Sequence, residues 1–163
     1  MNVLPTLPQL LIQNCVIENA SSGLVNIAPT GASAKVFVDL RNVAIHSSNG
    51  YGVNVDSTAG TIELHTSIID SDIYLVGGVG VNVTSKTGSH SFVSVSRSHS
   101  HYTGTAAISS TGAGAVVYMG ADEVVDNNVG LTSASGGAIT SAGNNFVTGN
   151  SVNGAPTSTV PPE

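Results

Sequence analysis

The chain has 163 residues, of which only 9% are charged, and its formal net charge is -6 at pH 7. Its four basic residues, Lys35, Arg41, Lys86 and Arg97, offer little surface for neutralising phosphates, so we expect no nucleic-acid partner. The single cysteine, Cys15, excludes an intrachain disulfide, and no apolar run reaches the roughly 20 residues of a membrane span.

A short phrase recurs along the chain at a fixed interval. It reads Val25-Asn-Ile27, Val53-Asn-Val55 and Val81-Asn-Val83, so the second copy lies as far from the first as the third lies from the second. We extend the same position to Ala106 and Leu131, at two slightly shorter and equal intervals. A fixed period of this length indicates a solenoid in which each repeat is one coil. The Asn of each phrase is expected to point outward and to form a ladder between coils.

Two further segments in each coil alternate apolar and other residues with period two, as half-buried strands do. One segment comprises Val36–Leu40, Ile62–Leu64, Phe92–Val95 and Val116–Met119. The other comprises Asn14–Ile17, Asn42–Ile45, Ser67–Ile69, Glu123–Val125 and Asn145–Val147. Clusters of Gly, Asn and Ser separate these segments as turns.

The sequence therefore predicts an all-β fold, a single-stranded right-handed parallel β-helix of about five to six coils with three short strands per coil. Residues 1–13 are expected to form a lead-in or partial first coil, residues 14–154 the β-helix domain, and residues 155–163 an extended tail. An antiparallel β-sandwich is the alternative, but it does not require a constant interval.

Several phrases carry a resemblance to a known family: Ile12–Ile17, Val93–Ser98, Gly143–Asn150 and Asn153–Thr157. The chain resembles the bacterial right-handed parallel β-helix repeat proteins of the pectate-lyase-like superfold, many of which have no known function. The resemblance implies a link to polysaccharides and an extracellular or cell-surface location. The segment Met1–Gln13 shows neither the basic head nor the cleavage site of a signal peptide. No cluster of Asp with a neighbouring Arg matches the family's lyases.

Stacking of coils brings residues at equivalent positions into ladders about 5 Å apart. One ladder is read from the residues that follow four aligned inward positions, Ile17, Ile45, Ile69 and Ser100. Its members are Glu18, His46, Asp70 and His101. His99 lies on the same strand face as His101. These carboxylates and histidines are candidate metal ligands or acid–base pairs, and a solvated edge of opposite charges is the plainer interpretation.

A second ladder is expected where Asp39 and Glu63 would stack, with Ser94 and Tyr118 beyond them. Two stacked carboxylates repel each other unless a cation lies between them, and calcium prefers such oxygen ligands. No cofactor is expected, and calcium is the ion that such a pair of carboxylates could bind. The alternative is a surface cluster in which Arg41 compensates the carboxylates.

Arg41 and His65 lie two residues further along the same face. The predicted ligand-binding residues are Asp39, Glu63, His65 and Tyr118, and the candidates for catalysis are Asp39, Glu63 and Arg41. The sequence favours a non-enzymatic binding or structural module, with polysaccharide at a bacterial surface as the expected ligand. The alternatives are a small polysaccharide-active lyase or hydrolase, and an oligomerisation or spike-like scaffold.

The front of the chain, Met1–Ile12, is apolar, and Pro5 and Pro8 oppose a helical cap. The ends of a solenoid expose strand edges and core residues unless something covers them. We therefore expect a homo-oligomer that forms through the N-terminal end or a side face.

Overall fold

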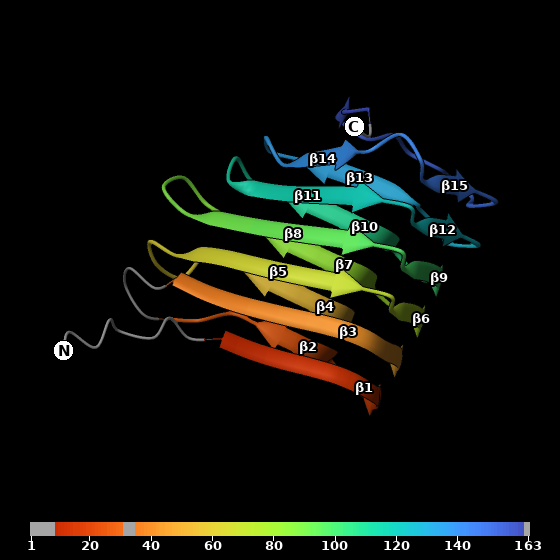
Figure 1. Ribbon diagram of the computed structural model, residues 1–163, viewed down its shortest axis with the longest axis horizontal. Coiled ribbons are helices and arrows are strands. Elements are labelled where there is room, and N and C mark those ends of the chain that lie inside the picture. Colours follow the sequence, from red (N-terminus) through yellow and green to blue (C-terminus); the bar gives the residue numbers. More distant parts are fainter. Residues whose placement is uncertain (1–8, 31–34, 162–163) are drawn as a thin grey trace.

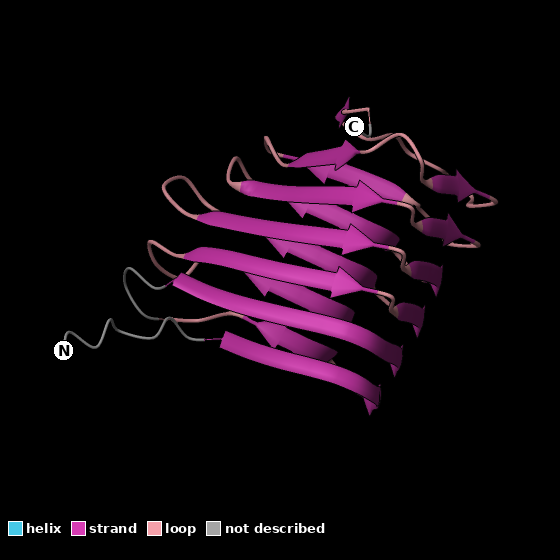
Figure 2. Ribbon diagram, in the orientation of Figure 1, coloured by secondary structure: helices cyan, strands magenta, loops and turns pink. Residues whose placement is uncertain are grey.

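A computed structural model describes residues 9–30 and 35–161, which form a parallel β-solenoid of about five turns (Figures 1 and 2). Residues 1–8 of the predicted lead-in and residues 162–163 of the predicted tail lie outside this part. No helix that could cross a membrane occurs in the described part of the chain.

In the described part of the chain, sixteen strands form two sheets. The larger sheet comprises β1 (Gln9–Ala20), β3 (Lys35–Ser48), β5 (Glu63–Ile69), β6 (Asp72–Val76), β8 (His90–Ser96), β9 (His99–Thr103), β11 (Ala115–Gly120), β12 (Glu123–Val125), β14 (Ala138–Ser141), β15 (Phe146–Thr148) and β16 (Ser158–Thr159). The smaller sheet comprises β2 (Gly23–Ile27), β4 (Tyr51–Asp56), β7 (Val79–Thr84), β10 (Ala106–Thr111) and β13 (Leu131–Ala134). The larger sheet has the order β15-β12-β9-β6-β3-β5-β8-β11-β14-β16, with β1 paired to β3, and the smaller has the order β13-β10-β7-β4-β2.

Each coil contributes two arms to the larger sheet and one strand to the smaller sheet, which lies behind it in Figure 1. In β1 and β3 the two arms form one strand that bends at a corner; in later coils the arms are separate strands. In five successive coils the corner residue has a left-handed backbone conformation, with φ of 54° at Asn14, 52° at Asn42, 51° at Asp70, 50° at Arg97 and 58° at Ala121. The predicted β-helix is confirmed, and its parallel pairing rules out the β-sandwich.

The pairing of the smaller sheet confirms the repeated phrase and corrects its extension. Val25 pairs with Val53 and Val53 with Val81, but Val81 pairs with Ile108 rather than with the predicted Ala106. Ile108 in turn pairs with Leu131. The spacing is therefore constant over the first three copies and shortens most sharply between Ile108 and Leu131, because the later coils are shorter.

The Asn residues of the phrase form the expected ladder on the outer face of the smaller sheet. Asn82 Nδ2 donates to Asn54 Oδ1 at 2.8 Å, and Asn54 Nδ2 donates to Asn26 Oδ1 at 2.8 Å. Each amide thus links its coil to the next, in addition to the backbone pairing.

Aliphatic side chains from both sheets fill the interior in stacked columns. One column contains Ile45, Ile73 and Val124, all at most 1% exposed, with the buried Ser100 between Ile73 and Val124. Ile73 lies on β6, which the sequence analysis did not identify. The segment Ser67–Ile69, assigned there to the second arm, is instead the end of β5 and pairs with Asp39–Arg41.

Polar side chains line the inside of the first corner, where the backbone turns and leaves N–H groups without strand partners. The N–H of Ser71 donates to Ser98 Oγ at 3.2 Å, the N–H of Ser98 to Asp122 Oδ1 at 3.0 Å, and the N–H of Asp122 to Asn145 Oδ1 at 2.8 Å. Each coil therefore supplies the acceptor that the preceding coil needs, which satisfies buried donors.

The buried carboxyl group of Asp122 makes the fold sensitive to pH. Asp122 is 3% exposed, and burial raises its pKa from 3.8 to about 6, although the N–H groups of Ser98 and Gly120 donate to it. Because the folded state holds the proton more tightly than the unfolded state, this group's contribution to stability is full below about pH 4. It is lost as the pH rises to about 6.

We predict that the free energy of unfolding falls by about 2–3 kcal/mol through this group between about pH 4 and pH 6. Asp122→Asn removes the titrating group, so its stability should change less over the same range. Denaturant unfolding of both proteins across this range measures the difference, in which contributions of the histidines cancel. Parallel pH profiles for the two proteins would show that Asp122 does not titrate as the geometry implies.

The second corner carries two apolar side chains in a strained backbone conformation. Leu75 and Tyr102 have φ of 52° and 54°, and both are 55% exposed. A left-handed conformation costs a bulky L-residue about 1–2 kcal/mol, whereas Asn tolerates it. Their exposed side chains recover little of this cost through packing.

Leu75→Asn should therefore raise the free energy of unfolding, by about 0.5–1 kcal/mol. The matched control is Val76→Asn, one residue further along, because Val76 is 1% exposed and its replacement buries a polar group. Chemical denaturation of the two variants should give changes of opposite sign. A loss of stability in Leu75→Asn would mean that Leu75 packs more favourably than its exposure indicates.

Candidate functional site

A row of rings crosses the outer face of the larger sheet on its first arm. Phe37 of β3, His65 of β5 and Phe92 of β8 occupy equivalent positions and point away from the core. The centroid of the His65 ring lies 5.0 Å from that of Phe37 and 5.2 Å from that of Phe92, with interplanar angles of 14° and 27°. We call these three residues the ring platform, because parallel offset rings form a continuous apolar surface.

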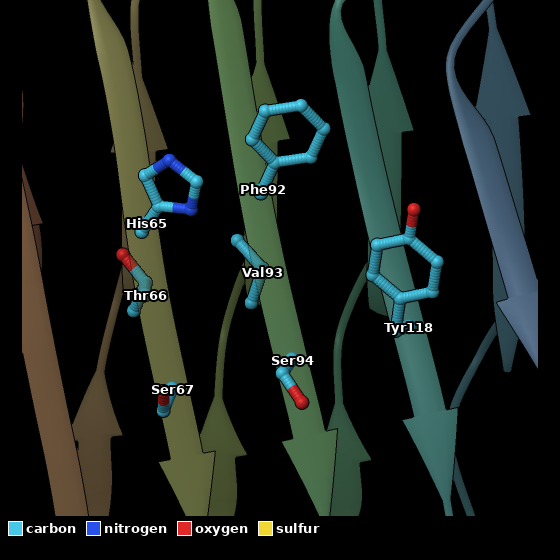
Figure 3. A pocket seen from close by; sticks show the side chains of 7 residues that line it. All are labelled: His65, Thr66, Ser67, Phe92, Val93, Ser94 and Tyr118. Atoms are coloured by element: carbon cyan, nitrogen blue, oxygen red, sulfur yellow. The ribbon is translucent and has the colours of Figure 1, made fainter.

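Small side chains lie beside the ring platform, two residues further along each strand. Ser67 and Ser94 occupy the outward positions between Asp39 at one end of the row and Tyr118 at the other. Their short side chains leave space beside the taller rings. Figure 3 shows the rings of His65, Phe92 and Tyr118 around this space, with the two serines on neighbouring strands.

The space forms two adjoining depressions. One, of about 330 Å³, is lined by His65, Thr66, Ser67, Phe92, Val93, Ser94 and Tyr118. The other, of about 470 Å³, is lined by Gln9, Leu10, Leu11, Phe37, Asp39, His65 and Ser67. Because both include His65 and Ser67, they form one trench that runs across the strands from β1 to β11, and we refer to it as the trench.

Ion pairs compensate the charges at the edge of the trench. Glu63 Oε1 lies 2.8 Å from Lys35 Nζ and 2.6 Å from His65 Nε2, and the hydrogen bond from Lys35 is the larger cause of a lowered pKa at Glu63. Arg41 lies 3.4 Å from Asp39. All four partners of these two salt bridges are partly exposed, so each pair contributes little to stability. Both cations at the edge of the trench thus have a carboxylate partner.

The predicted stack of Asp39 on Glu63 is wrong. Asp39 pairs with Ser67, and Glu63 pairs with Lys35 on one side and His90 on the other. Period-two alternation assigns each residue to the inner or outer face, but it fits equally well after a shift of four residues. The calcium expectation rested on this stack, and the register does not provide it. Three of the predicted ligand-binding residues, Asp39, His65 and Tyr118, nevertheless line the trench, whereas Glu63 does not.

The predicted ladder of Glu18, His46, Asp70 and His101 is correct except at one position. Tyr74, not Asp70, lies between His46 and His101. Its ring centroid is 4.6 Å from that of His46 and 5.2 Å from that of His101. Asp70 lies at the corner, where Arg97 binds both of its carboxylate oxygens at 2.8 and 3.0 Å.

The candidate metal ligands pair with separate partners. His46 Nε2 lies 3.3 Å from Glu18, His101 Nε2 lies 3.0 Å from Asp72, and His99 Nε2 lies 3.7 Å from Glu123. Within residues 9–30 and 35–161, no group of three or more His, Cys, Asp or Glu side chains could hold a metal ion.

Sequence reasoning missed Phe92 and Ser67 as residues of the site. Phe92 could have been found, because Val93 and Val95 alternate as inward residues and Phe92 must then point outward. Ser67 could not, because its place beside Asp39 depends on the register between β3 and β5.

Comparisons with protein-family models, with curated proteins and with solved structures give no match to this chain. The proposed function therefore rests on the fold and the trench alone.

Proposed function

We propose that the protein is a non-enzymatic binding module that holds a polysaccharide chain in the trench. The observation that supports this is the ring platform lying directly beside the hydroxyl groups of Ser67 and Ser94. Pyranose rings have an apolar C–H face, which packs on aromatic rings, and peripheral hydroxyls, which need hydrogen-bond partners. The trench offers both, and it is long and open, as a polymer requires.

The ligand that fits this surface at neutral pH is an uncharged polysaccharide. An acidic polymer needs a cation, and the two basic side chains near the trench, Lys35 and Arg41, are already paired with Glu63 and Asp39. The net charge of -6 also opposes the approach of a polyanion. Such a role is consistent with an extracellular or cell-surface location, which we propose on the same grounds.

A small polysaccharide-active enzyme remains the alternative, with Asp39, Glu63 and Arg41 as its candidate residues. It predicts release of new reducing or unsaturated ends from a bound polymer. Asp39→Asn would abolish that release if Asp39 were catalytic, whereas a binding module retains the polymer without product.

We predict that the wild-type protein is retarded in affinity gels containing a neutral polymer such as xyloglucan or galactomannan. Tyr118→Ala and Phe92→Ala should each weaken retention by about three- to tenfold, because each removes one stacking ring. The matched control is Tyr102→Ala, which removes a similarly exposed tyrosine at the second corner, outside the trench. Unchanged retention of Tyr118→Ala, or no retention of the wild type, would rule out the trench as the site.

A second candidate role, assembly into a scaffold, is supported by the first coil. Leu10, Leu11 and Val16 of β1 are 51%, 54% and 60% exposed. Leu10 belongs to an interior column, since it pairs with the buried Val38, and within residues 9–30 and 35–161 no further coil covers it at this end of the stack. Joining two such ends would bury them.

If the ends join, the protein should sediment as an oligomer, and Leu10→Lys should shift it to the monomer. Placing a charge in the contact would oppose burial of the end. Tyr102→Lys, at a residue with 55% exposure on β9, which β6 and β3 separate from β1, should leave the oligomer intact. Sedimentation velocity of the three proteins makes the comparison, and a monomeric wild type would contradict assembly.

A further inference from the structure

His65 occupies the centre of the trench and is shared by both of its halves. Phe37 and Phe92 lie on either side of its ring, so the only titratable ring of the platform is flanked by two neutral ones. Glu63 Oε1 lies 2.6 Å from His65 Nε2. Since the pKa of Glu63 is lowered by its hydrogen bonds to Lys35 and His65, this carboxyl is ionised at neutral and mildly acidic pH, and it can only accept a hydrogen bond.

The hydrogen bond to Glu63 therefore fixes the proton of neutral His65 on Nε2 and leaves Nδ1 as an acceptor. Figure 3 shows a ring nitrogen of His65 on the side that faces β8, where Phe92 and Val93 line the trench. When the imidazole takes up a proton, Nδ1 becomes a charged donor. Nδ1 therefore accepts a hydrogen bond from a ligand in the trench when His65 is neutral, and donates one when His65 is protonated.

The charges that face His65 come from its own strand and the two neighbouring strands. Glu63 lies on its own strand, Lys35 and Asp39 lie on β3, and His90 lies on β8, where its ring centroid is 5.6 Å from that of Phe92. Lys35 and Glu63 compensate each other at 2.8 Å, and Asp39 is paired with Arg41. Protonation of His65 thus adds a positive charge that no basic residue of the trench supplies at neutral pH.

We infer that His65 sets the charge preference of the trench: it accepts a hydroxyl of a neutral polysaccharide when unprotonated, and it binds a carboxylate of an acidic polysaccharide when protonated. This inference rests on the proposed function. Histidine changes charge between about pH 5 and pH 8. A shift across this range would therefore extend binding from neutral to uronate-containing polymers.

The test measures the affinity for polygalacturonate at about pH 5 and about pH 8, with xyloglucan as the neutral reference. In the wild type, affinity for polygalacturonate should be about two- to fivefold higher at the lower pH, the range for one exposed charge pair. His65→Gln keeps a donor for Glu63 but cannot be charged, so the ratio of its two affinities should fall below that of the wild type. The other four histidines are present in both proteins, so their general effect on the net charge is common to the two ratios.

His101→Gln is the matched control, because His101 also pairs with a carboxylate and stacks on an aromatic ring, but lies on the second arm outside the trench. It should keep the wild-type ratio, as should His90→Gln. An equal ratio in His65→Gln and the wild type, or a ratio of one in the wild type, would overturn the inference while xyloglucan binding persists. Absence of binding to either polymer at both pH values would overturn the proposed function and this inference together.

Discussion

The structure depends on parallel backbone pairing between successive coils in a fixed register. This pairing places each residue directly beside its equivalent in the preceding coil, from Val25 and Val53 in the first coils to Ile108 and Leu131 near the C-terminus. Every other contact follows from it: aliphatic columns inside, the Asn ladder on the smaller sheet and the ring platform on the larger one. A chain with few charges can use this fold because the stabilising contacts are made between identical or similar side chains.

The corners show what this pairing requires of polar side chains. At a corner, the backbone leaves N–H groups that have no partner in a neighbouring strand. The next coil supplies a side-chain oxygen that accepts each of these hydrogen bonds. The acceptor is a Ser hydroxyl in the earlier coils and the longer side chain of Asp122 or Asn145 in the later ones. Asp122 is the exception among these residues, since it is ionisable. At the second corner Asn127 accepts from the N–H of Thr103, and its neutral amide carries no charge that burial would destabilise.

The sequence allowed the fold and the facing of most strands to be predicted, but not the register between them. Each error is an even number of residues: Ala106 in place of Ile108, Asp70 in place of Tyr74, and Glu63 in place of Ser67. Apolar alternation distinguishes inward from outward residues. It therefore reveals a register shift of an odd number of residues but not one of an even number. Register is instead decided by the lengths of the turns, which differ from coil to coil and have no apolar pattern.

The candidate site could be predicted only in part from the sequence, for the same reason. Asp39, His65 and Tyr118 were predicted to lie outside, and that alone brings them to one face. Their neighbours, and therefore the trench, depend on register. Once register is fixed, the outer face repeats with the coils, as shown by equivalent rings on β3, β5 and β8. A single small ligand needs only one such rung. The proposal of a polymer rests on the rings that three successive coils present, because a ligand that itself repeats could contact each of them.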